Sequence, residues 1–408
     1  MTTSTAILVL RHGISHSRNA TKTIQPPELR KALSAPRESP FSTSGGLLRP
    51  FSTASPPSGK LSEEKGTTAS PPPPISPNQN KANHIGISCI TELSKAKLSA
   101  LVVSTASFGF LAAGSPISWP TLVACSAGTA LCSSSASTWN QIFEIDRDAK
   151  MKRTAHRPLV KGTVSSRSAK LLGTMTGVSG GSVLLYGTDP VTAALGVSNI
   201  ALYAGLYTYL KPRHEINTWV GAVVGAIPPV MGWTAAGGSP SDIEAILMGS
   251  TLFLWQFPHF FALSWMHRKD YGRGGFQMVP VNDVHTKGDR TAALIMRYTA
   301  YLSTLPFLST ALDVTSPMFA IEGVALNAYA LYVAKQFDKE RSNANARKVF
   351  LTSLWYLPSF MMLFILHSKT WKDEEKAMDK NATEKWNVLL QNWIRDARNK
   401  GKELCLHE

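Results

Sequence analysis

Three oxygen-bearing side chains recur at intervals of four residues near the middle of the chain. They are Asn140, Glu144 and Asp148. In a helix, a step of four residues turns the side-chain direction by only about 40°, so all three lie on one face. Two carboxylates and one amide on one face offer the oxygen ligands that Mg²⁺ prefers, especially where the metal bridges to a phosphate. The spacing therefore predicts a magnesium site.

Basic residues follow this face at once, namely Lys150, Lys152, Arg153, Arg157 and Lys161. The guanidinium group of arginine can bind two oxygens of one phosphate. It could therefore bind the phosphate oxygens that a metal ion held by the acids does not contact. A basic loop at a membrane surface would explain these charges by topology alone, but it would not explain the ordered acids. We therefore favour a diphosphate site over a solvated loop.

The elements that must position these residues have the composition of membrane helices. The 408-residue chain is 44% hydrophobic with a net charge of +15, yet five long runs contain no Asp, Glu, Lys or Arg. Most of these runs approach the ~20 residues needed to cross a bilayer. This excludes a soluble globular enzyme, and four cysteines without metal-ligand spacing exclude a disulfide scaffold. The pattern predicts an all-α membrane protein of about nine transmembrane helices, near 98–114, 118–138, 169–187, 190–210, 216–234, 243–266, 292–312, 317–335 and 348–367.

Lysine and arginine are confined to alternate connections between these segments. The second, fourth, sixth and eighth connections hold twenty, and the other four hold none. The positive-inside rule places the N-terminus and all basic connections on one side and the C-terminus on the other. The uncharged connections are also short, so they join antiparallel neighbours. We expect the chemistry at the longer, basic face.

The ends of the chain differ from its middle. Residues 1–60 carry eight Lys and Arg against two acids and are rich in Ser and Thr, which is typical of a mitochondrial transit segment; a merely disordered basic tail is the alternative. Residues 61–95, with four consecutive prolines, are expected to form a disordered linker. The transmembrane domain is then 96–368 and the polar tail 369–408. If the transit prediction holds, the active site faces the matrix from the inner membrane.

The run Asn140-x-x-x-Glu144-x-x-x-Asp148, followed by Met151-x-Arg153-Thr154-x-x-Arg157-Pro158-Leu159, resembles the UbiA-type intramembrane prenyltransferases. Within them, the stretches 207–233, 254–265 and 270–278 resemble the branch that farnesylates heme, and the resemblance covers about residues 95–367. There are two departures. Glu144 stands where most of the superfamily carries Asp, and the second Asp-x-x-x-Asp motif is absent, because Gly274 lies four residues after Asp270.

The resemblance implies a helical bundle around a central chamber and a farnesyl transfer from farnesyl diphosphate to heme B. With water this gives heme O, the precursor of heme A for cytochrome c oxidase. Heme B is a substrate, and Mg²⁺ is the cofactor. The lipid bilayer and the downstream machinery of heme A synthesis are the other implied partners, and no nucleic acid is expected. The implied site residues are Asn140, Glu144 and Asp148 for the metal, Lys152, Arg153, Arg157 and Lys211 for the diphosphate, and His259, Asp270 and Tyr271 for catalysis.

His259 lies nine residues before Arg268, which places it ~13 Å from the basic face. Ionisable groups at membrane depth are costly and usually functional. The resemblance puts this histidine in the chamber, where it would contact heme or steer water, and both roles remain open. A hydrogen-bonded core histidine is the structural alternative. Asp270 and Tyr271 are expected to form a second wall of the site.

Two other functions deserve comparison. A related enzyme that prenylates an aromatic acid for ubiquinone would need the second acidic motif, which is missing. A secondary transporter would use Glu144 and Asp148 to couple ions, but such sites lie near the midplane of repeated halves. Here the acids stand at a helix end and no repeat is visible, so a transporter is the weaker alternative.

Overall fold

The computed structural model describes residues 86–370 except residue 115, together with residues 392–399. The predicted transit segment 1–60, the linker up to residue 85 and most of the 369–408 tail lie outside the described residues. Apart from one isolated bridge between Thr315 and Ser368, the described residues form helices, turns and loops. The all-α prediction is therefore confirmed.

The described ranges contain nine long helical segments, and each overlaps one of the nine predicted. They are α3 (Ala96–Ala112), α4 (Trp119–Phe143), α6 (Ser166–Gly187), the continuous α7, η2 and α8 (Pro190–Ile200, Ala201–Tyr207 and Thr208–Leu210), α9 (Asn217–Ala235), α10 (Ile243–Met266), α13 (Asp289–Ala311), α14 (Pro317–Lys339) and α15 (Asn343–His367). The short helices are α2 (Ile87–Leu93), α5 (Ile145–Asp148), α11 (Arg268–Arg273) and α12 (Val279–Asn282), and residues 392–399 are helical as well.

Four of the long segments are long and apolar enough to cross a membrane by length and composition alone. They are Pro190–Leu210, Ile243–Met266, Pro317–Lys339 and Asn343–His367. The helical membrane bundle is thus supported directly, while the count of nine crossings stays a prediction.

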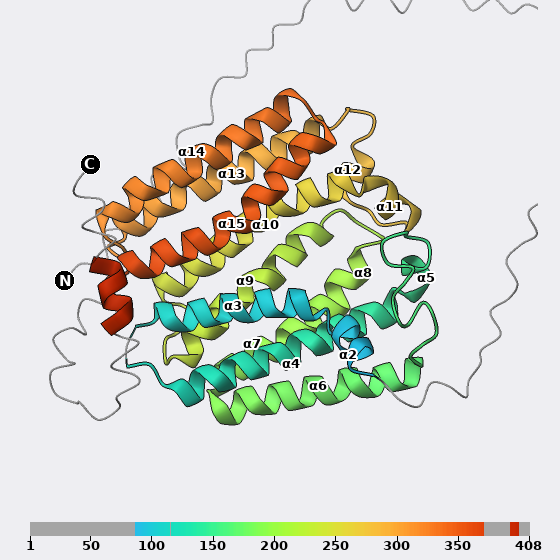
Figure 1. The fold of residues 1–408 in the computed structure, drawn as a ribbon, viewed down its shortest axis with the longest axis horizontal. Helices are drawn as coiled ribbons and strands as arrows, with labels where there is room; N and C mark the ends of the chain where they lie inside the picture. Colours follow the sequence, from blue (N-terminus) through green and yellow to red (C-terminus); the bar gives the residue numbers. More distant parts are fainter. Residues whose placement is uncertain (1–85, 115, 371–391, 400–408) are drawn as a thin grey trace, which may run out of the picture. The chain divides into compact units, whose positions relative to one another are not determined.

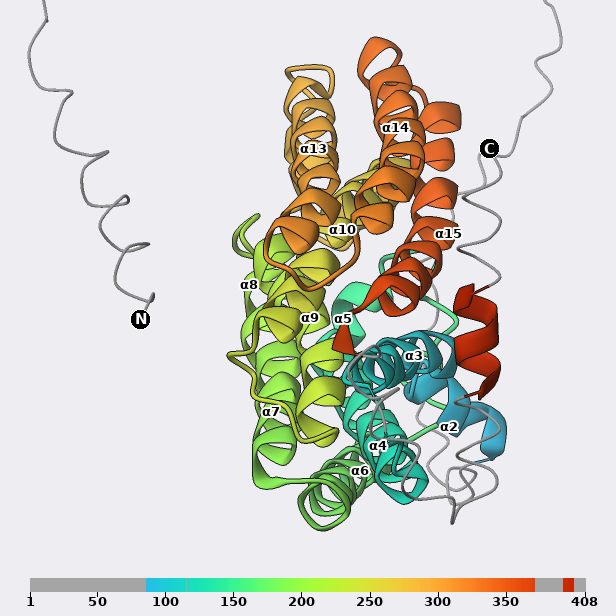
Figure 2. The ribbon, with the colours of Figure 1, turned by 90° about the vertical axis from the view of Figure 1, so that its left-hand side faces the viewer.

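Short connections join helices that pack against each other as antiparallel pairs, as predicted. The pairs are α3 with α4, α6 with α7, α9 with α10, and α13 with α14. Helix α10 also packs on α13 and α15, and α9 also packs on α3, so α9 and α10 link two groups of helices. Figure 2 shows α13, α14 and α15 in one group and α3, α4, α6 and α7 in the other.

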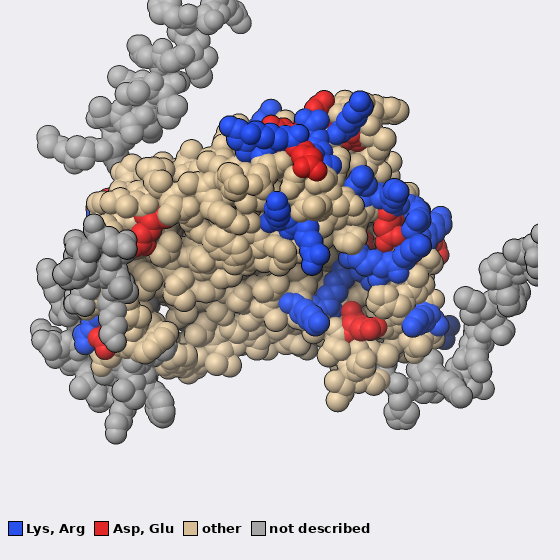
Figure 3. Space-filling view, turned by 45° about the horizontal axis from the view of Figure 1, so that its top comes forward, with Lys and Arg blue, Asp and Glu red and all other residues tan. Residues whose placement is uncertain are grey.

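The basic connections gather at one end of the helices. Helices α5, α11 and α12 lie at this end in Figure 1, and Figure 3 shows most Lys and Arg side chains there, while the helix flanks are largely uncharged. The predicted charge asymmetry is therefore present in the described part of the chain.

Helices α3 and α9 touch through their backbones at two glycines. A Cβ atom at Gly109 would lie 1.9 Å from the carbonyl oxygen of Pro229, and one at Gly232 would lie 1.8 Å from the carbonyl oxygen of Ala106. Small residues permit this close approach between helices in membranes. Pro228 and Pro229 therefore sit at a tight crossing.

The last part of the expected linker is ordered, which corrects the predicted boundary. Ile87–Leu93 form α2, and Leu93 is fully buried against Leu159 and Val164. The side-chain amide of Gln141 donates to the carbonyl oxygens of Glu92 and Leu93, at 3.1 and 2.8 Å. The proline-rich composition ends before this segment. The buried Leu93 side chain and the two hydrogen bonds from Gln141 fix the segment to α4.

Candidate active site

The three residues predicted to hold a metal share one buried face at the end of α4. Asn140, Glu144 and Asp148 are 1%, 3% and 1% exposed. The backbone breaks at Glu144, but hydrogen bonds from Glu144 N to Asn140 O (3.1 Å) and from Asp148 N to Glu144 O (2.8 Å) keep the helical register into α5. Asp146 is exposed on the other side. We call Asn140, Glu144 and Asp148 the acid-bearing face.

Each residue of the acid-bearing face contacts a basic side chain from a different segment. Lys211 Nζ lies 2.6 Å from Glu144 Oε1, and Arg157 forms an ion pair with Asp148 Oδ2. Lys95 Nζ donates to Asn140 Oδ1 at 2.8 Å. Three basic side chains thus already surround the position where a diphosphate would meet a metal.

The acid-bearing face suits a divalent cation. Among the described residues, no three or more His, Cys, Asp and Glu side chains lie close enough together to hold a metal ion. A metal ion at the acid-bearing face would therefore take two carboxylates and one amide from the protein. Asp148 Oδ1 is buried and has no hydrogen-bond partner, which is costly for a carboxylate oxygen. Burial raises the pKa of Asp148, and Glu144 acts in the same direction while Arg157 opposes it. A Mg²⁺ ion would satisfy the unpartnered oxygen.

Three further residues of this site, on η2 and α8, were not predicted from the sequence. Thr208 Oγ1 accepts from Asn140 Nδ2 at 2.9 Å and donates to the carbonyl oxygen of Tyr203 at 2.8 Å. The Tyr203 hydroxyl accepts from Lys95 Nζ at 3.1 Å, and Lys211 Nζ lies 5.3 Å from the centre of the Tyr207 ring. The sequence carries two signals for them. Tyr203 and Tyr207 lie four residues apart in an apolar run, and the stretch 207–233 that carries the resemblance begins at Tyr207.

Lys95 was also missed, because it falls in the segment read as a linker. It precedes α3 in a left-handed backbone conformation with φ 48°. That conformation costs a non-glycine residue about 1–3 kcal/mol and occurs often at functional sites. Burial, and next the charge of Arg157, lowers the pKa of Lys95 to about 7.

Asp270 and Tyr271 do approach the site, but Asp270 faces the neighbouring loop. Its carboxylate accepts from the backbone N–H of Lys152 (2.9 Å) and of Arg153 (3.2 Å), and Arg273 lies 3.3 Å away. Although burial alone would raise it, the pKa of Asp270 is lowered by these N–H donors. Asp270 therefore holds the 152–153 backbone in place.

The four cations predicted to bind one diphosphate divide between two places. Lys211 and Arg157 contact the acid-bearing face. Arg153 instead lies over the Tyr271 ring at 5.5 Å and donates to its hydroxyl at 3.3 Å. The Lys152 side chain is exposed, near Arg153.

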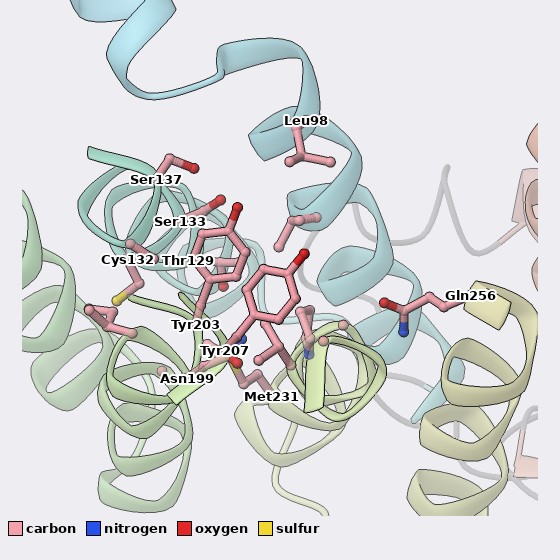
Figure 4. Close-up of a pocket in the computed structure, with 18 of the residues that line it drawn as sticks. Leu98, Thr129, Cys132, Ser133, Ser137, Asn199, Tyr203, Tyr207, Met231 and Gln256 are labelled. Atoms are coloured by element: carbon pink, nitrogen blue, oxygen red, sulfur yellow. The ribbon is translucent and has the colours of Figure 1, made fainter. Parts of the chain in front are cut away.

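An apolar cavity of about 200 Å³ lies among the helices (Figure 4). Side chains of α3, α4, α7, η2, α9 and α10 line it. Tyr203 and Tyr207 project into it, and Gln256 enters from α10. Because the same tyrosines contact Lys95 and Lys211, they form the boundary between the apolar cavity and the charged site.

His259 is not among the residues that line this cavity, so the structure does not place it where the resemblance implied. Its Nδ1 lies 2.8 Å from Ser353 Oγ on α15, and its ring packs 4.8 Å from the rings of Trp255 and Phe350. Phe260, one residue on, does line the cavity, since adjacent helical residues point about 100° apart. The contacts of His259 are those of a hydrogen-bonded core histidine, and its catalytic role stays a prediction.

Comparison with known proteins gives consistent results. The model of the UbiA prenyltransferase family matches residues 101–362. The chain is 46% identical over 276 residues to the human protein named "Protoheme IX farnesyltransferase, mitochondrial", covering 68% of this chain and 61% of that protein. The protein of that name from Arabidopsis thaliana is 43% identical over 281 residues, with 68% of this chain and 64% of that protein covered. The match thus spans less than two thirds of either relative.

Two solved structures resemble this one in fold. A structure of a digeranylgeranylglyceryl phosphate synthase in membranes aligns with a TM-score of 0.57 at 16% identity, covering 69% of this chain and 97% of that chain. A UbiA homolog from Archaeoglobus fulgidus bound to DMAPP and Mg²⁺ aligns with a TM-score of 0.51 at 13% identity, covering 68% and 98%. At these identities the likeness concerns the fold alone.

Proposed function

The chain belongs to the UbiA prenyltransferase family, and from this premise we propose that it transfers a farnesyl group from farnesyl diphosphate to heme B, giving heme O. One observation carries the proposal: a buried face of two carboxylates and an amide, contacted by three cations, stands at the end of an apolar cavity. The names of the relatives at 43–46% identity support heme as the acceptor.

In this proposal Asn140, Glu144 and Asp148 hold Mg²⁺, which when bound neutralises the charge of the diphosphate leaving group. Lys211 and Arg157 turn from the acids, and Lys95 turns from Asn140, to the remaining phosphate oxygens. Preorganised charges of this kind stabilise a leaving group where its negative charge develops. Breaking the bond between C1 and oxygen then leaves an allylic cation on the farnesyl chain.

The apolar cavity holds the isoprenoid chain and keeps water from the cation. The faces of Tyr203 and Tyr207, at the charged end, can stabilise an allylic cation by cation–π attraction. With about 200 Å³, the cavity is smaller than the ~300–1,000 Å³ of typical ligand pockets. We therefore assign it to the isoprenoid chain alone and place the tetrapyrrole outside it.

Carbon–carbon bond formation follows when a vinyl group of heme attacks C1. The electron pair of the vinyl double bond forms the new bond, and the positive charge moves to the vinyl carbon attached to the macrocycle. Water adds to that carbon and loses one proton, which completes the hydroxyethylfarnesyl group. We assign no residue of this chain to the proton.

We further propose that the protein lies in the mitochondrial inner membrane with the acid-bearing face toward the matrix. The uneven distribution of Lys and Arg and the mitochondrial names of the relatives support this orientation. The C-terminal tail then lies in the intermembrane space. Protease added to intact mitoplasts should cut the tail and spare residues 144–170, and the reverse pattern would reject the orientation.

The activity is tested by incubating purified protein with heme B and isotopically labelled farnesyl diphosphate, with and without Mg²⁺. Mass spectrometry should detect labelled heme O only when the metal is present. Prenylation of 4-hydroxybenzoate instead of heme would favour the ubiquinone-type alternative. Absence of any diphosphate release with either acceptor would reject a prenyltransferase.

A further inference from the structure

A second, larger concavity lies at the basic end of the helices, and the reaction steps described above assign it no role. It has a volume of about 550 Å³ and is bordered by Lys152, Arg153, Arg268, Lys269 and Arg273. Asp270 is the one acid on its wall. We call this concavity the basic bowl.

The basic bowl is a built feature and more than a collection of surface charges. The Asp270 carboxylate joins two distant segments by accepting from the backbone N–H of Lys152 and Arg153. Arg268 is held by the carbonyl oxygen of Trp265 (2.7 Å) and by Asn343 Oδ1 (3.0 Å). Membrane topology requires positive charge at this end, but it does not require such fixed positions.

The charge balance of the bowl leaves cations available to a ligand. Five positive side chains face one carboxylate, and that carboxylate is already hydrogen-bonded to two N–H groups and paired with Arg273. Within the described residues, the ammonium groups of Lys152 and Lys269 have no hydrogen-bond or ion-pair partner. An anion with two negative groups would match them.

One layer of aromatic rings separates the bowl from the acid-bearing face. Arg153 lies over Tyr271, the Tyr271 and Phe276 rings meet edge to face at 6.2 Å, and Lys211 Nζ lies 4.5 Å from the Phe276 ring centre. Tyr271 and Phe276 are buried together with Met151 and Met278. A ligand anchored in the bowl is therefore next to the site of farnesyl transfer.

We propose that the basic bowl binds the two propionate carboxylates of the acceptor tetrapyrrole, an assignment that rests on the proposed function. The diphosphate is not the ligand, because Lys95, Arg157 and Lys211 at the acid-bearing face serve it. In protoporphyrin the carboxylates and the vinyl groups stand on opposite edges of the macrocycle. Holding the carboxylates at the aqueous end thus directs the vinyl edge toward the helices, where the allylic cation forms.

The test uses the full chain in nanodiscs of neutral phosphatidylcholine, titrated with fluorescent zinc protoporphyrin and with its dimethyl ester. The wild type should bind the free acid more tightly than the ester. The double variant Lys152→Gln/Lys269→Gln should bind the free acid about tenfold to a hundredfold more weakly, since two charge-assisted contacts are lost, and should bind the ester unchanged. The control Lys335→Gln/Lys339→Gln removes two exposed charges from the same end, outside the bowl, and should match the wild type.

Three results would overturn the assignment. If the double variant and the wild type bound the free acid with equal affinity, the basic bowl would not be the binding site of the propionate carboxylates. If the double variant bound farnesyl thiodiphosphate more weakly than the wild type, Lys152 would belong to the diphosphate site. Loss of a co-purified anionic phospholipid from the double variant, with unchanged porphyrin affinity, would make the bowl a lipid site. Heme O formation by the wild type shows whether the proposed function itself holds. If that function fails, the wild type should neither form heme O nor bind the porphyrin.

Discussion

The ammonium group of Lys95, in the turn before α3, lies 2.8 Å from the side-chain oxygen of Asn140 on α4, 45 residues further along the chain. The same ammonium group lies 3.1 Å from the Tyr203 hydroxyl at the head of the apolar cavity. The amino group of Lys95 therefore stands where the diphosphate head and the isoprenoid chain of the donor would meet.

Replacing Lys95 by Met, which keeps length and removes charge, should weaken binding of farnesyl thiodiphosphate about tenfold to a hundredfold. This corresponds to the ~1.5–3 kcal/mol of a hydrogen bond to a charged group. Lys97→Met is the matched control, because Lys97 is exposed two residues further on. Binding equal to wild type in Lys95→Met would leave this lysine with a structural role only.

Proton uptake gives an independent measure of the same residue. The pKa of Lys95 is lowered to about 7, so at pH 8 the group is mostly neutral in the free protein. A bound diphosphate favours the ammonium form and raises this pKa again. Binding at pH 8 should thus take up nearly one proton, and binding at pH 6 much less, since the lysine is already charged there. Calorimetry in buffers of different ionisation enthalpy measures this uptake, and it should disappear in Lys95→Met.

The sequence allowed the helices and the acid-bearing face to be predicted because both depend on local periodicity. Long apolar runs mark the nine long helices, and a spacing of four marks one helical face. Lys95 could not be found this way, since it reaches Asn140 only through the packing of α2 on α4. The division between Arg153 and Arg157 also depends on tertiary contacts, with Tyr271 in one case and Asp148 in the other.

The placement of His259 shows a limit of another kind. Depth in the membrane follows from counting residues, but the direction of the side chain depends on which helix packs on which face of α10. Here α15 supplies Ser353 as a partner. A polar residue at depth can thus be satisfied by a neighbouring helix and need not face a chamber.

Asp148→Asn should lower heme O formation by at least a hundredfold, because a neutral amide replaces one of the two carboxylates proposed to hold the metal. Binding of Mn²⁺ with farnesyl thiodiphosphate, followed by electron paramagnetic resonance, should fall as well. Asp146→Asn is the control, since Asp146 is exposed on the opposite side and should behave as wild type. Near-normal turnover in Asp148→Asn would show that the metal assignment is wrong. Glu144→Asp should be milder, since it keeps the charge.

Asp270→Ala should loosen the loop that carries Lys152 and Arg153, because two backbone N–H groups lose their acceptor. Hydrogen exchange at these amides should become faster, and heme O formation should fall. Asp270→Asn keeps one carbonyl oxygen and should restore part of the protection. Unchanged exchange in Asp270→Ala would contradict the positioning role.

Arg153 and Arg157 should respond differently to replacement by Lys, although their spacing suggested that both grip one diphosphate. Arg157 pairs with Asp148 at the acid-bearing face, while Arg153 lies over Tyr271 at the edge of the basic bowl. Lys keeps the charge and so preserves membrane orientation, but it cannot make the two-pronged contact of a guanidinium. Arg157→Lys should therefore weaken farnesyl thiodiphosphate binding about tenfold or more, and Arg153→Lys should leave it close to wild type. Farnesyl thiodiphosphate binding is measured at matched protein levels. Equal losses in both variants would restore a joint clamp, and no loss in Arg157→Lys would remove Arg157 from the diphosphate site.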